Sequence, residues 1–537
     1  MHEPNQPPAP SDLGARLLEA IELLEAVDEN RSLLAHLDTE GRKRLLMVAG
    51  KVSHPDMQAR RQLSRAQRKQ RKIDKRDNEE AILDQTAIRK MRENPIFATP
   101  RRIAQYAGEP PQLPGFGYEL PAELEAPAQP ASQPEAQPAA GPIIGERRAA
   151  YSCYVCRQDY SEIHWFYDQM CAACGDFNHS RRDPVADLSG RIAVVTGARV
   201  KIGFQSAIML LRNGCRVVVA TRFPRDAARR YAAEPDFAEW GHRLEIHGLD
   251  LRHIPSVEAF CQTLLRTLPH LDYIINNACQ TVRRPPGFYG HLMERERSMA
   301  GEANPVELRL LAEPNALQDD VSDAAAAALT ANRFTGILPS AEFSQVPLIA
   351  EDFENGEHLF PTGRLDADEQ QVDLRNMNSW RLKLADVETV ELLEVHVVNA
   401  VAPFILNARL KPLMERVPTA DKHIVNVSAM EGQFYRTFKS DRHPHTNMAK
   451  ASLNMMTRTS AADYIESGIH MNSVDTGWVT DEDPAAIAQM KRDMHRFHPP
   501  LDIVDGAARI VDPIFDGLRT GKHVWGQFLK DYRITDW

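Results

Sequence analysis

The stretch that most restricts the fold is IAVVTGARVKIG, at residues 192–203. Its first residues are apolar and predict a buried parallel strand, because such strands are covered on both faces. Gly197 allows a tight turn, and Gly203 allows close approach of the following helix, which continues as FQSAIMLLRNG and ends at Gly214. The first N–H groups of that helix lack helical partners, so this segment predicts a phosphate-binding site.

Alternating strand and helix patterns continue from this segment toward the end of the chain. The predicted strands are 192–196, 215–221, 243–248, 271–276, 423–428, 469–474 and 522–528. Helices fit between most of them. The alternation predicts an α/β domain over 185–537, built on a doubly wound parallel sheet with right-handed crossovers.

Two segments of different composition, a helical region and a linker, precede the alternating region. Residues 11–95 are predicted to be helical, since Ser11 can cap a helix in which Leu17, Ile21 and Leu24 share one face. Residues 108–148 are rich in Pro, Ala, Glu and Gln and poor in β-branched residues. That composition predicts a disordered linker with a domain boundary on each side.

The helical region contains a basic run. Nine Lys or Arg and a single acid, Asp74, lie between Arg60 and Arg76. The run could bind nucleic acid or an acidic partner, but no aromatic residue within 60–76 offers base stacking. A solvated helix face is favoured, and the net charge of −10 also argues against a whole-protein polyanion binder.

Four cysteines form two CxxC pairs in YSCYVCRQDYSEIHWFYDQMCAACGDFN. Fourteen residues separate Cys156 from Cys171, a spacing typical of a tetrahedral four-thiolate zinc site. Cys153, Cys156, Cys171 and Cys174 therefore predict a structural zinc module over 149–180. Free thiols or a redox dithiol are the alternatives, but a single redox CxxC would not explain two pairs.

The cysteine pattern also bears on location. Seven cysteines with this spacing do not resemble a disulfide framework, so a reducing, cytoplasmic setting is expected. The segment MHEPNQPPAPSD lacks the basic and apolar regions of a signal peptide. No apolar run approaches the roughly 20 residues that span a bilayer, so no membrane association is expected.

The second predicted strand, CRVVVATR, ends in Thr221 and Arg222. An NAD site would usually place an acid here for the ribose hydroxyls, whereas Arg suits the 2′-phosphate of NADP. Arg199 and Lys201 add positive charge in the glycine turn. These residues favour NADP(H) over NAD(H), the alternative being that the basic side chains merely flank a loop.

The order of motifs resembles that of the short-chain dehydrogenase/reductase superfamily. TGARVKIG matches its TGxxxGxG loop, and GLDL, INNAC, VNAVAPF, NVSAM, NMAKASLNMM and NSVDTGWVT follow in family order over roughly 185–530. The resemblance implies a Rossmann fold and an NADP(H)-dependent oxidoreductase acting on a carbonyl, alcohol or conjugated small molecule. Family members commonly form dimers or tetramers, so a homo-oligomer is expected.

The resemblance also implies roles for individual residues. Asp250 would contact adenine, Asn277 would support a strand end, and Thr480 would meet the carboxamide. The full set of cofactor-binding residues is Thr196, Gly197, Arg199, Lys201, Ile202, Gly203, Thr221, Arg222, Asp250, Leu251, Asn277, Ala278, Lys450, Gly477, Val479 and Thr480.

Three further residues match the family's chemical machinery. Asn399 would anchor a proton-relay water, and Ser428 would hydrogen-bond the substrate carbonyl. Lys450 would bind the nicotinamide ribose and lower the pKa of a nearby acid. The logic is general, because hydride delivery to a carbonyl needs an acid to protonate the developing alkoxide.

The family's proton donor is a Tyr four residues before the Lys, and here that position is Thr446. A Thr hydroxyl is far less acidic than a phenol and cannot replace it directly. Tyr435 is the first alternative donor, followed by His443 and His445, whose imidazoles have a suitable pKa. Alternatively, the reaction needs no Tyr, or the chain is a catalytically silent NADP(H)-binding scaffold or sensor that assembles partners.

A long insertion separates two of the motifs, since Asn277 and Asn399 are 122 positions apart. The extra material is roughly 281–385 and leaves the carboxyl end of a central strand, where open α/β sheets bind ligands. It predicts a cap over the substrate, with an Ala-rich helix over 319–334, the alternative being an oligomer contact. Its arginines would suit an anionic substrate: Arg283, Arg284, Arg375 and Arg381.

Overall fold

The computed structural model describes residues 10–100, 141–297, 305–312, 340–354, 356–435 and 439–537. Contacts divide the chain into two compact units, Met1–Ala81 and Ile82–Trp537. The predicted helix over 319–334 and most of the predicted linker lie outside the described residues.

The first unit is helical, as the sequence predicts. Its elements are α1 (Pro10–Glu29), η1 (Arg31–His36), α2 (Thr39–Ser53) and most of α3 (Met57–Leu83). Asp38 caps α2 by accepting a hydrogen bond from the N–H of Gly41. The nine basic side chains from Arg60 to Arg76 are exposed on α3, so binding of nucleic acid there stays a prediction.

The second unit contains the predicted parallel sheet. Its strand order is β5-β4-β3-β6-β7-β8-β9-β10, and all neighbours are parallel except the antiparallel pair β9–β10. The order reverses direction at β3, which is the first strand of this sheet in sequence, and this creates the crevice where such sheets bind ligands. The strands are β3 (Ile192–Thr196), β4 (Arg216–Thr221), β5 (Leu244–Gly248), β6 (Tyr273–Asn276), β7 (Lys422–Ser428), β8 (Ile469–Asp475), β9 (Phe528–Lys530) and β10 (Arg533–Thr535).

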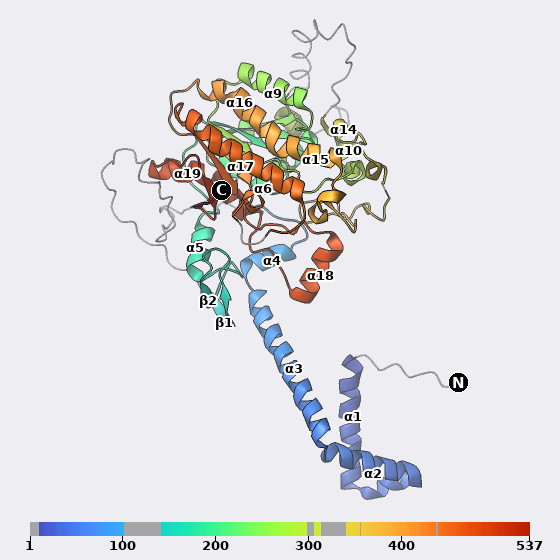
Figure 1. The fold of residues 1–537 in the computed structure, drawn as a ribbon. Helices are drawn as coiled ribbons and strands as arrows, with labels where there is room; N and C mark the ends of the chain where they lie inside the picture. Colours follow the sequence, from blue (N-terminus) through green and yellow to red (C-terminus); the bar gives the residue numbers. More distant parts are fainter. Residues whose placement is uncertain (1–9, 101–140, 298–304, 313–339, 355, 436–438) are drawn as a thin grey trace. The chain divides into compact units, whose positions relative to one another are not determined.

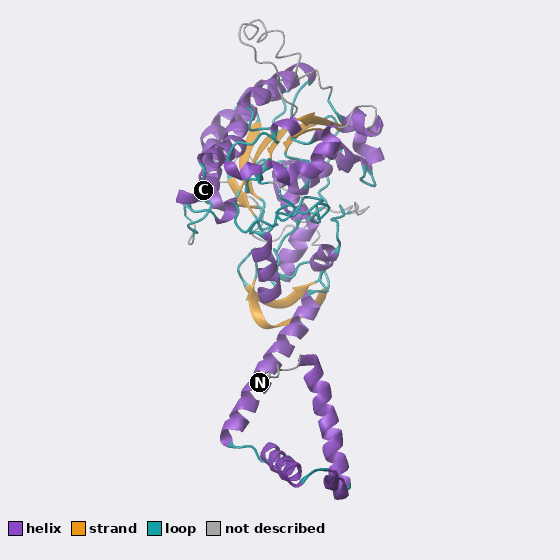
Figure 2. Ribbon diagram, turned by 90° about the vertical axis from the view of Figure 1, so that its right-hand side faces the viewer, coloured by secondary structure: helices purple, strands orange, loops and turns teal. Residues whose placement is uncertain are grey.

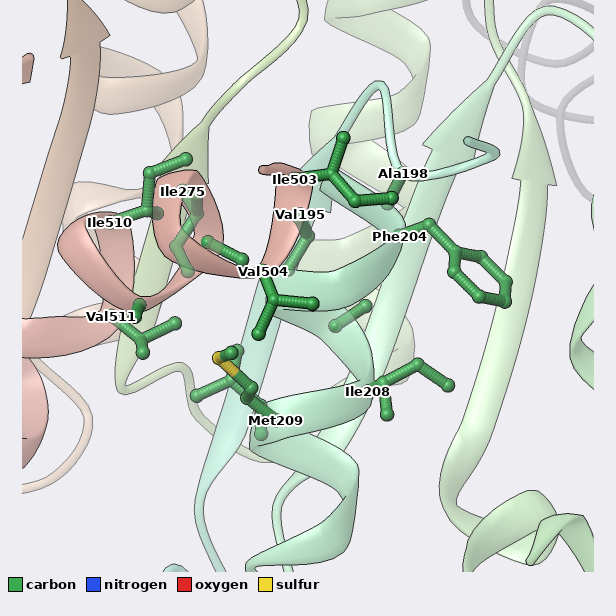
Figure 3. Packing of buried hydrophobic residues seen from close by; sticks show 14 of the residues in the cluster. Val195, Ala198, Phe204, Ile208, Met209, Ile275, Ile503, Val504, Ile510 and Val511 are labelled. Carbon is green, nitrogen blue, oxygen red and sulfur yellow. The ribbon is translucent and has the colours of Figure 1, made fainter. Parts of the chain in front are cut away.

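Helices cover both faces of this sheet (Figures 1 and 2). One face is packed by α6 (Lys201–Arg212) and α19 (Ile503–Thr520), the other by α9 (Ile254–Thr267), α16 (Ala402–Met414) and α17 (Pro444–Ile465). Figure 3 shows the first layer, where Ile208 and Met209 of α6 and Val504 of α19 pack with Val195 of β3. Burial of this apolar layer holds the glycine turn and the strand ends in place.

The end of the sheet differs from the prediction. The strand predicted at 522–528 is found as β9, Phe528–Lys530, and a short strand β10 follows it. Asp531 and Tyr532 have φ of 47° and 65°, the left-handed values of a two-residue hairpin turn. That turn is usually marked by Asn-Gly or Asp-Gly, so the sequence carries no signal for it.

The four-cysteine module belongs to the second unit. It comprises β1 (Ile143–Ser152), β2 (Asp159–His164) and α5 (Ala172–Ser180), so it begins inside the segment predicted as linker. β1 and β2 form an antiparallel hairpin. Cys153, Tyr167 and Phe177 lie in the same apolar cluster as α6 and α19, so the module and the sheet share one core.

The remaining elements connect the sheet or belong to the insertion. They are α4 (Ala87–Glu93), α7 (Pro224–Ala232), α8 (Phe237–Trp240), η3 (Gly241–Arg243), η4 (Pro286–Tyr289), α10 (Gly290–Arg297), α11 (Pro305–Leu310), α14 (Ser340–Phe343), η5 (Ala350–Phe353), η6 (Ser379–Arg381), η7 (Leu384–Asp386), α15 (Thr389–His396), η8 (Val397–Val401), η9 (Met430–Gly432) and α18 (Ala485–His495).

One described segment, Thr389–Met414, is long and apolar enough to cross a membrane by length and composition alone. Its most apolar window is 39% buried inside the protein. α16 within it packs beside α9 in the sheet's second layer, and core helices of soluble proteins meet the same criterion.

Candidate functional site

A cleft of about 1030 Å³ opens at the carboxyl ends of the central strands. Most of the residues predicted to bind a cofactor line it, together with two of the predicted catalytic residues. They are Gly197, Arg199, Lys201, Ile202, Gly203, Thr221, Arg222, Asp250, Leu251, Asn277, Ala278, Ser428, Lys450, Gly477, Val479 and Thr480.

The glycine turn at the floor of this cleft leaves no room for side chains. Gly197 has φ +66°, and a Cβ there would lie 2.8 Å from Cα of Ala278. A Cβ on Gly203 would lie 2.2 Å from Nδ2 of Asn277, which donates to the carbonyls of Thr196 (3.0 Å) and Gly197 (3.2 Å). The helix α6 that follows has no side-chain cap on its first N–H groups, so they are available to an anion.

The three basic residues predicted near the cofactor have different surroundings. Arg199 is buried and pairs with Asp226 at 2.6 Å. Lys201 lies 3.9 Å from a carboxylate of the insertion. Arg222 donates to the hydroxyl of Tyr289 at 2.7 Å and, among the described residues, forms no ion pair. Of the three, only Arg222 lines the cleft without an ion pair to a described residue.

Elements of the second helical layer position the predicted catalytic residues. Asn399 lies in a π-helical turn, η8, and its side chain bonds the backbone N–H (2.7 Å) and carbonyl (3.2 Å) of Gln280. Lys450 Nζ donates to the carbonyl of Val427 at 2.7 Å. Ser428 Oγ, at the end of β7, is buried and has no hydrogen-bond partner within the described part of the chain.

The alternative proton donors do not line the cleft. The Tyr435 side chain is 88% exposed. The buried His443 ring stacks on Trp380 with centroids 3.9 Å apart, and His445 lies 3.2 Å from Glu391. Thr446, at the family's Tyr position, is buried too and is not among the residues that line the cleft.

Comparisons with known proteins match these motifs. The family profile described as "short chain dehydrogenase" matches residues 191–290, and "Enoyl-(Acyl carrier protein) reductase" matches 376–502. An uncharacterised protein of Acanthamoeba polyphaga mimivirus, R665, is 30% identical over 390 residues, covering 70% of this chain and 74% of R665.

The chain belongs to the short-chain dehydrogenase/reductase superfamily.

Named relatives match over a shorter range. Dehydrogenase/reductase SDR family member 13 of Bos taurus is 40% identical over 107 residues, which is 19% of this chain and 28% of that protein. A solved structure of NADPH-bound carbonyl reductase from chicken fatty liver is 16% identical, covers 65% of this chain and 100% of that chain, and has a TM-score of 0.39. The gap between the two profile matches, 291–375, falls within the insertion.

The four cysteines of this superfamily member come together as the sequence predicts. Their sulfur atoms lie within 4.8 Å of one another, and Cys156 and Cys171 are 3.8 Å apart. Tetrahedral Zn–S bonds of 2.3 Å place sulfurs about 3.8 Å apart, so the cluster could hold zinc.

The module also contributes a residue that the sequence analysis missed. Tyr154, inside the first CxxC pair, lines the cleft, and its hydroxyl accepts a hydrogen bond from the N–H of Trp478 at 2.9 Å. Burial raises the pKa of this phenol, so it stays protonated. Nothing local marks Tyr154, because its position depends on docking of the module against the sheet.

That docking is polar as well as apolar. Tyr167 donates to Asp505 of α19 at 2.5 Å. Arg182, just after α5, forms ion pairs with Asp502 (2.8 Å) and Asp505 (2.7 Å). Gln169 donates to the carbonyl of His498 at 2.7 Å.

Residues of the insertion reach the cleft. Thr281, Val282, Tyr289 and Trp380 contribute to the lining. Its arginines, however, are committed elsewhere. Each forms at least one ion pair with a carboxylate: Arg283 with Asp352 and Glu394, Arg284 with Asp373, Arg375 with Asp373 and Glu351, and Arg381 with Asp483.

Proposed function

We propose that this protein is an NADP(H)-dependent oxidoreductase that acts on a carbonyl, an alcohol or a conjugated small molecule. The convergence of the glycine turn, Ser428 and Lys450 on one cleft carries the proposal. Their order in the chain and their place at the carboxyl ends of the strands agree with the site expected for this superfamily.

The chain's own residues fit a reduction. NADPH, when bound, supplies the hydride. Ser428 Oγ, buried and without a partner among the described residues, can donate a hydrogen bond to the substrate oxygen as negative charge develops there. The Lys450 ammonium, oriented by the carbonyl of Val427, adds positive charge beside the strand end.

Removal of the Ser428 hydroxyl tests this site. Ser428→Ala is expected to lower kcat/KM roughly 10²–10³-fold, since one donor to the developing oxyanion is lost. Its hydroxyl satisfies no other described group, so the free energy of unfolding should not fall. If Ser428→Ala turns over a substrate of the wild-type protein at an unchanged rate, the assignment is contradicted.

The preference for NADP(H) rests on Arg222. Its guanidinium lies in the cleft at the end of β4, stacked on the ring of Tyr289 at 4.6 Å. Arg222→Ala is expected to weaken NADPH binding about 10–100-fold, because charge-assisted hydrogen bonds to phosphate are lost. NADH binding should change little, and an equal loss for both cofactors would contradict the 2′-phosphate role.

Of the tyrosines, we compare Tyr435, the first candidate from the sequence, with Tyr154. Tyr435 can serve only if its exposed segment folds over the cleft. Tyr154 already lines the cleft, next to Gly477, where a Cβ would lie 3.1 Å from the phenol oxygen. Its oxygen accepts from Trp478, so its proton is free to be donated. Tyr154 is therefore the better-placed donor.

Parallel Tyr→Phe variants separate the two. Tyr154→Phe should lower kcat roughly 10²-fold or more while NADPH affinity is retained, and Tyr435→Phe should leave kcat near the wild-type value. The reverse pattern would restore Tyr435 as the donor.

A catalytically silent NADP(H)-binding scaffold is the second candidate. The observation that favours it is the buried Thr446 at the family's Tyr position. NADPH binding without cofactor consumption over a panel of aldehydes, ketones, enones and imines would support the scaffold. Turnover of any of them that Ser428→Ala abolishes would rule it out.

The four thiolates are proposed to hold a structural zinc ion. All four ligands come from the chain, which is the closed arrangement typical of structural sites. Zinc analysis of the reduced protein tests this proposal, and absence of zinc would contradict it.

A further inference from the structure

A second group of potential metal ligands lies at the amino ends of the strands, whereas the cleft lies at their carboxyl ends. His423 and His470 are each the second residue of a strand, in β7 and β8, and they are direct cross-strand partners. His523 comes from the segment between α19 and β9. Three distant parts of the chain therefore bring imidazoles to the amino ends of neighbouring strands.

The three rings form a compact triangle. Their centroids are 5.1 Å (His423–His470), 5.1 Å (His423–His523) and 4.8 Å (His470–His523) apart. One nitrogen from each lies within 4.8 Å of the others, and His423 Nε2 is 2.9 Å from His523 Nδ1. Zn–N bonds of 2.0–2.1 Å in a tetrahedral site place nitrogens about 3.3 Å apart, so small ring rotations suffice.

We propose that His423, His470 and His523 form a second metal site in this protein, for zinc or a similar divalent transition ion. Imidazole ligands without a coordinating carboxylate suit zinc, cobalt, nickel or copper rather than calcium or magnesium. The proposal is independent of the cofactor site and of the four cysteines.

The surroundings favour a ligand role over ordinary packing. His470 Nδ1 lies 3.2 Å from the carbonyl of Lys422, and donation to it leaves the lone pair on Nε2, as in most histidine metal ligands. His423 is fully buried, yet its Nδ1 has no hydrogen-bond partner within the described residues. The His423 nitrogen that faces the other rings is Nε2, which lies 2.9 Å from His523 Nδ1 and is the atom offered to a metal.

The site is held from one side and open on the other. Gly517 of α19 closely approaches His523, since a Cβ there would lie 2.4 Å from Nδ1. The side chain of His523 remains partly exposed. Three ligands and a solvent-facing position describe a site that joins β7, β8 and the chain before β9.

Metal content of the full chain tests the site. Wild type is expected to hold about two zinc equivalents, and His523→Gln about one, because its four cysteines are intact. The matched control His242→Gln, an exposed histidine outside the cluster, should still hold two. If His523→Gln holds as many equivalents as wild type, the proposal is overturned.

Cobalt separates the two sites by spectrum. In Cys171→Ser three cysteines of the cluster remain and can still bind Co²⁺, so the histidine site is read as a difference. Part of the ligand-field absorption should be lost, with the thiolate charge-transfer band unchanged, when His523→Gln or His470→Asn is added. Two different histidine variants guard against misfolding of either, since melting curves identify an unfolded variant. Identical cobalt spectra of the folded protein with and without the histidine substitutions would show a hydrogen-bonded histidine cluster instead.

Discussion

At the scale of single residues, close contacts at the glycine turn shape one end of the cleft. Gly203 faces the side-chain amide of Asn277, which donates hydrogen bonds to the carbonyls of Thr196 and Gly197. Lys201 adopts φ +56° at the position where the family has glycine, so the turn tolerates one left-handed non-glycine residue. Space, more than backbone freedom, is therefore what Gly203 provides.

Gly203→Ala should accordingly be damaging. The new Cβ would lie 2.2 Å from Asn277 Nδ2 and 2.6 Å from the carbonyl oxygen of Gly197, so the turn must shift. We expect a loss of about 1–3 kcal/mol in the free energy of unfolding and loss of NADPH binding, measured by denaturation and calorimetry. Gly290→Ala, where nothing lies within 4 Å, is the control and should be neutral or slightly stabilising.

At the scale of elements, ionisable groups at helix contacts set the response to pH. Glu296 of α10 accepts hydrogen bonds from the backbone N–H groups of Asp226 (2.9 Å) and Arg225 (3.3 Å) at the start of α7. Burial raises the pKa of Glu296 to about 7 despite these bonds. The carboxyl is therefore protonated in the folded protein at pH values where it is ionised in the unfolded chain.

This shift predicts a pH dependence of stability. Between pH 4.5 and about 7 the folded state retains a proton that the unfolded state releases, so stability falls as pH rises through this window. Glu296→Gln should remove the decline and gain about 1 kcal/mol at pH 8, after allowance for solvent screening. Denaturation across pH measures it, Glu294→Gln on the same helix is the control, and an unchanged slope would contradict the prediction.

The four-cysteine module links metal binding to the cleft. Tyr154 lies between two of the proposed ligands, so order in the module fixes the phenol beside Gly477 and Trp478. A structural site with this placement would affect catalysis without touching the cofactor.

Cys171→Ser should therefore lower both zinc content and kcat, with a smaller effect on NADPH affinity. The melting temperature should also fall, because zinc binding stabilises the folded module. Cys261→Ala, a buried cysteine of α9, should leave the zinc content unchanged. If folded Cys171→Ser without zinc at the cysteine site keeps a normal kcat, the module has no role in the reaction.

At the scale of the whole molecule, the boundary between the two units lies within α3, not at the predicted linker. The module, α4 and the sheet belong to Ile82–Trp537. Arg89 of α4 pairs with Asp168 of the module at 2.7 Å, and Arg92 donates to the carbonyl of Leu501 at 3.0 Å. The module is thus part of the core of the second unit.

Truncation distinguishes these boundaries. A chain that begins at Ile82 should keep its melting temperature within a few degrees and retain NADPH binding. A chain that begins at Asp183 should lose stability, since it exposes the apolar cluster shared with Tyr167 and Phe177. Equal stability of both chains would contradict the shared core.

The sequence alone determined the sheet and the proposed cofactor site to a large extent. Strand periodicity, the TGARVKIG turn and the CxxC spacing are local patterns, and each is imposed by the chemistry of residues that are close in the chain. The left-handed hairpin at Asp531 escaped prediction because its residues carry no glycine signal.

Only the tertiary structure decided which side chains meet. Tyr154 reaches the cleft, the arginines of the insertion find carboxylates, and three distant histidines gather at the amino ends of the strands. These contacts join residues far apart in the chain, so no local pattern encodes them. They depend on how helices, module and insertion pack around the sheet, and burial then sets the partners, the charges and the proton occupancy of each group.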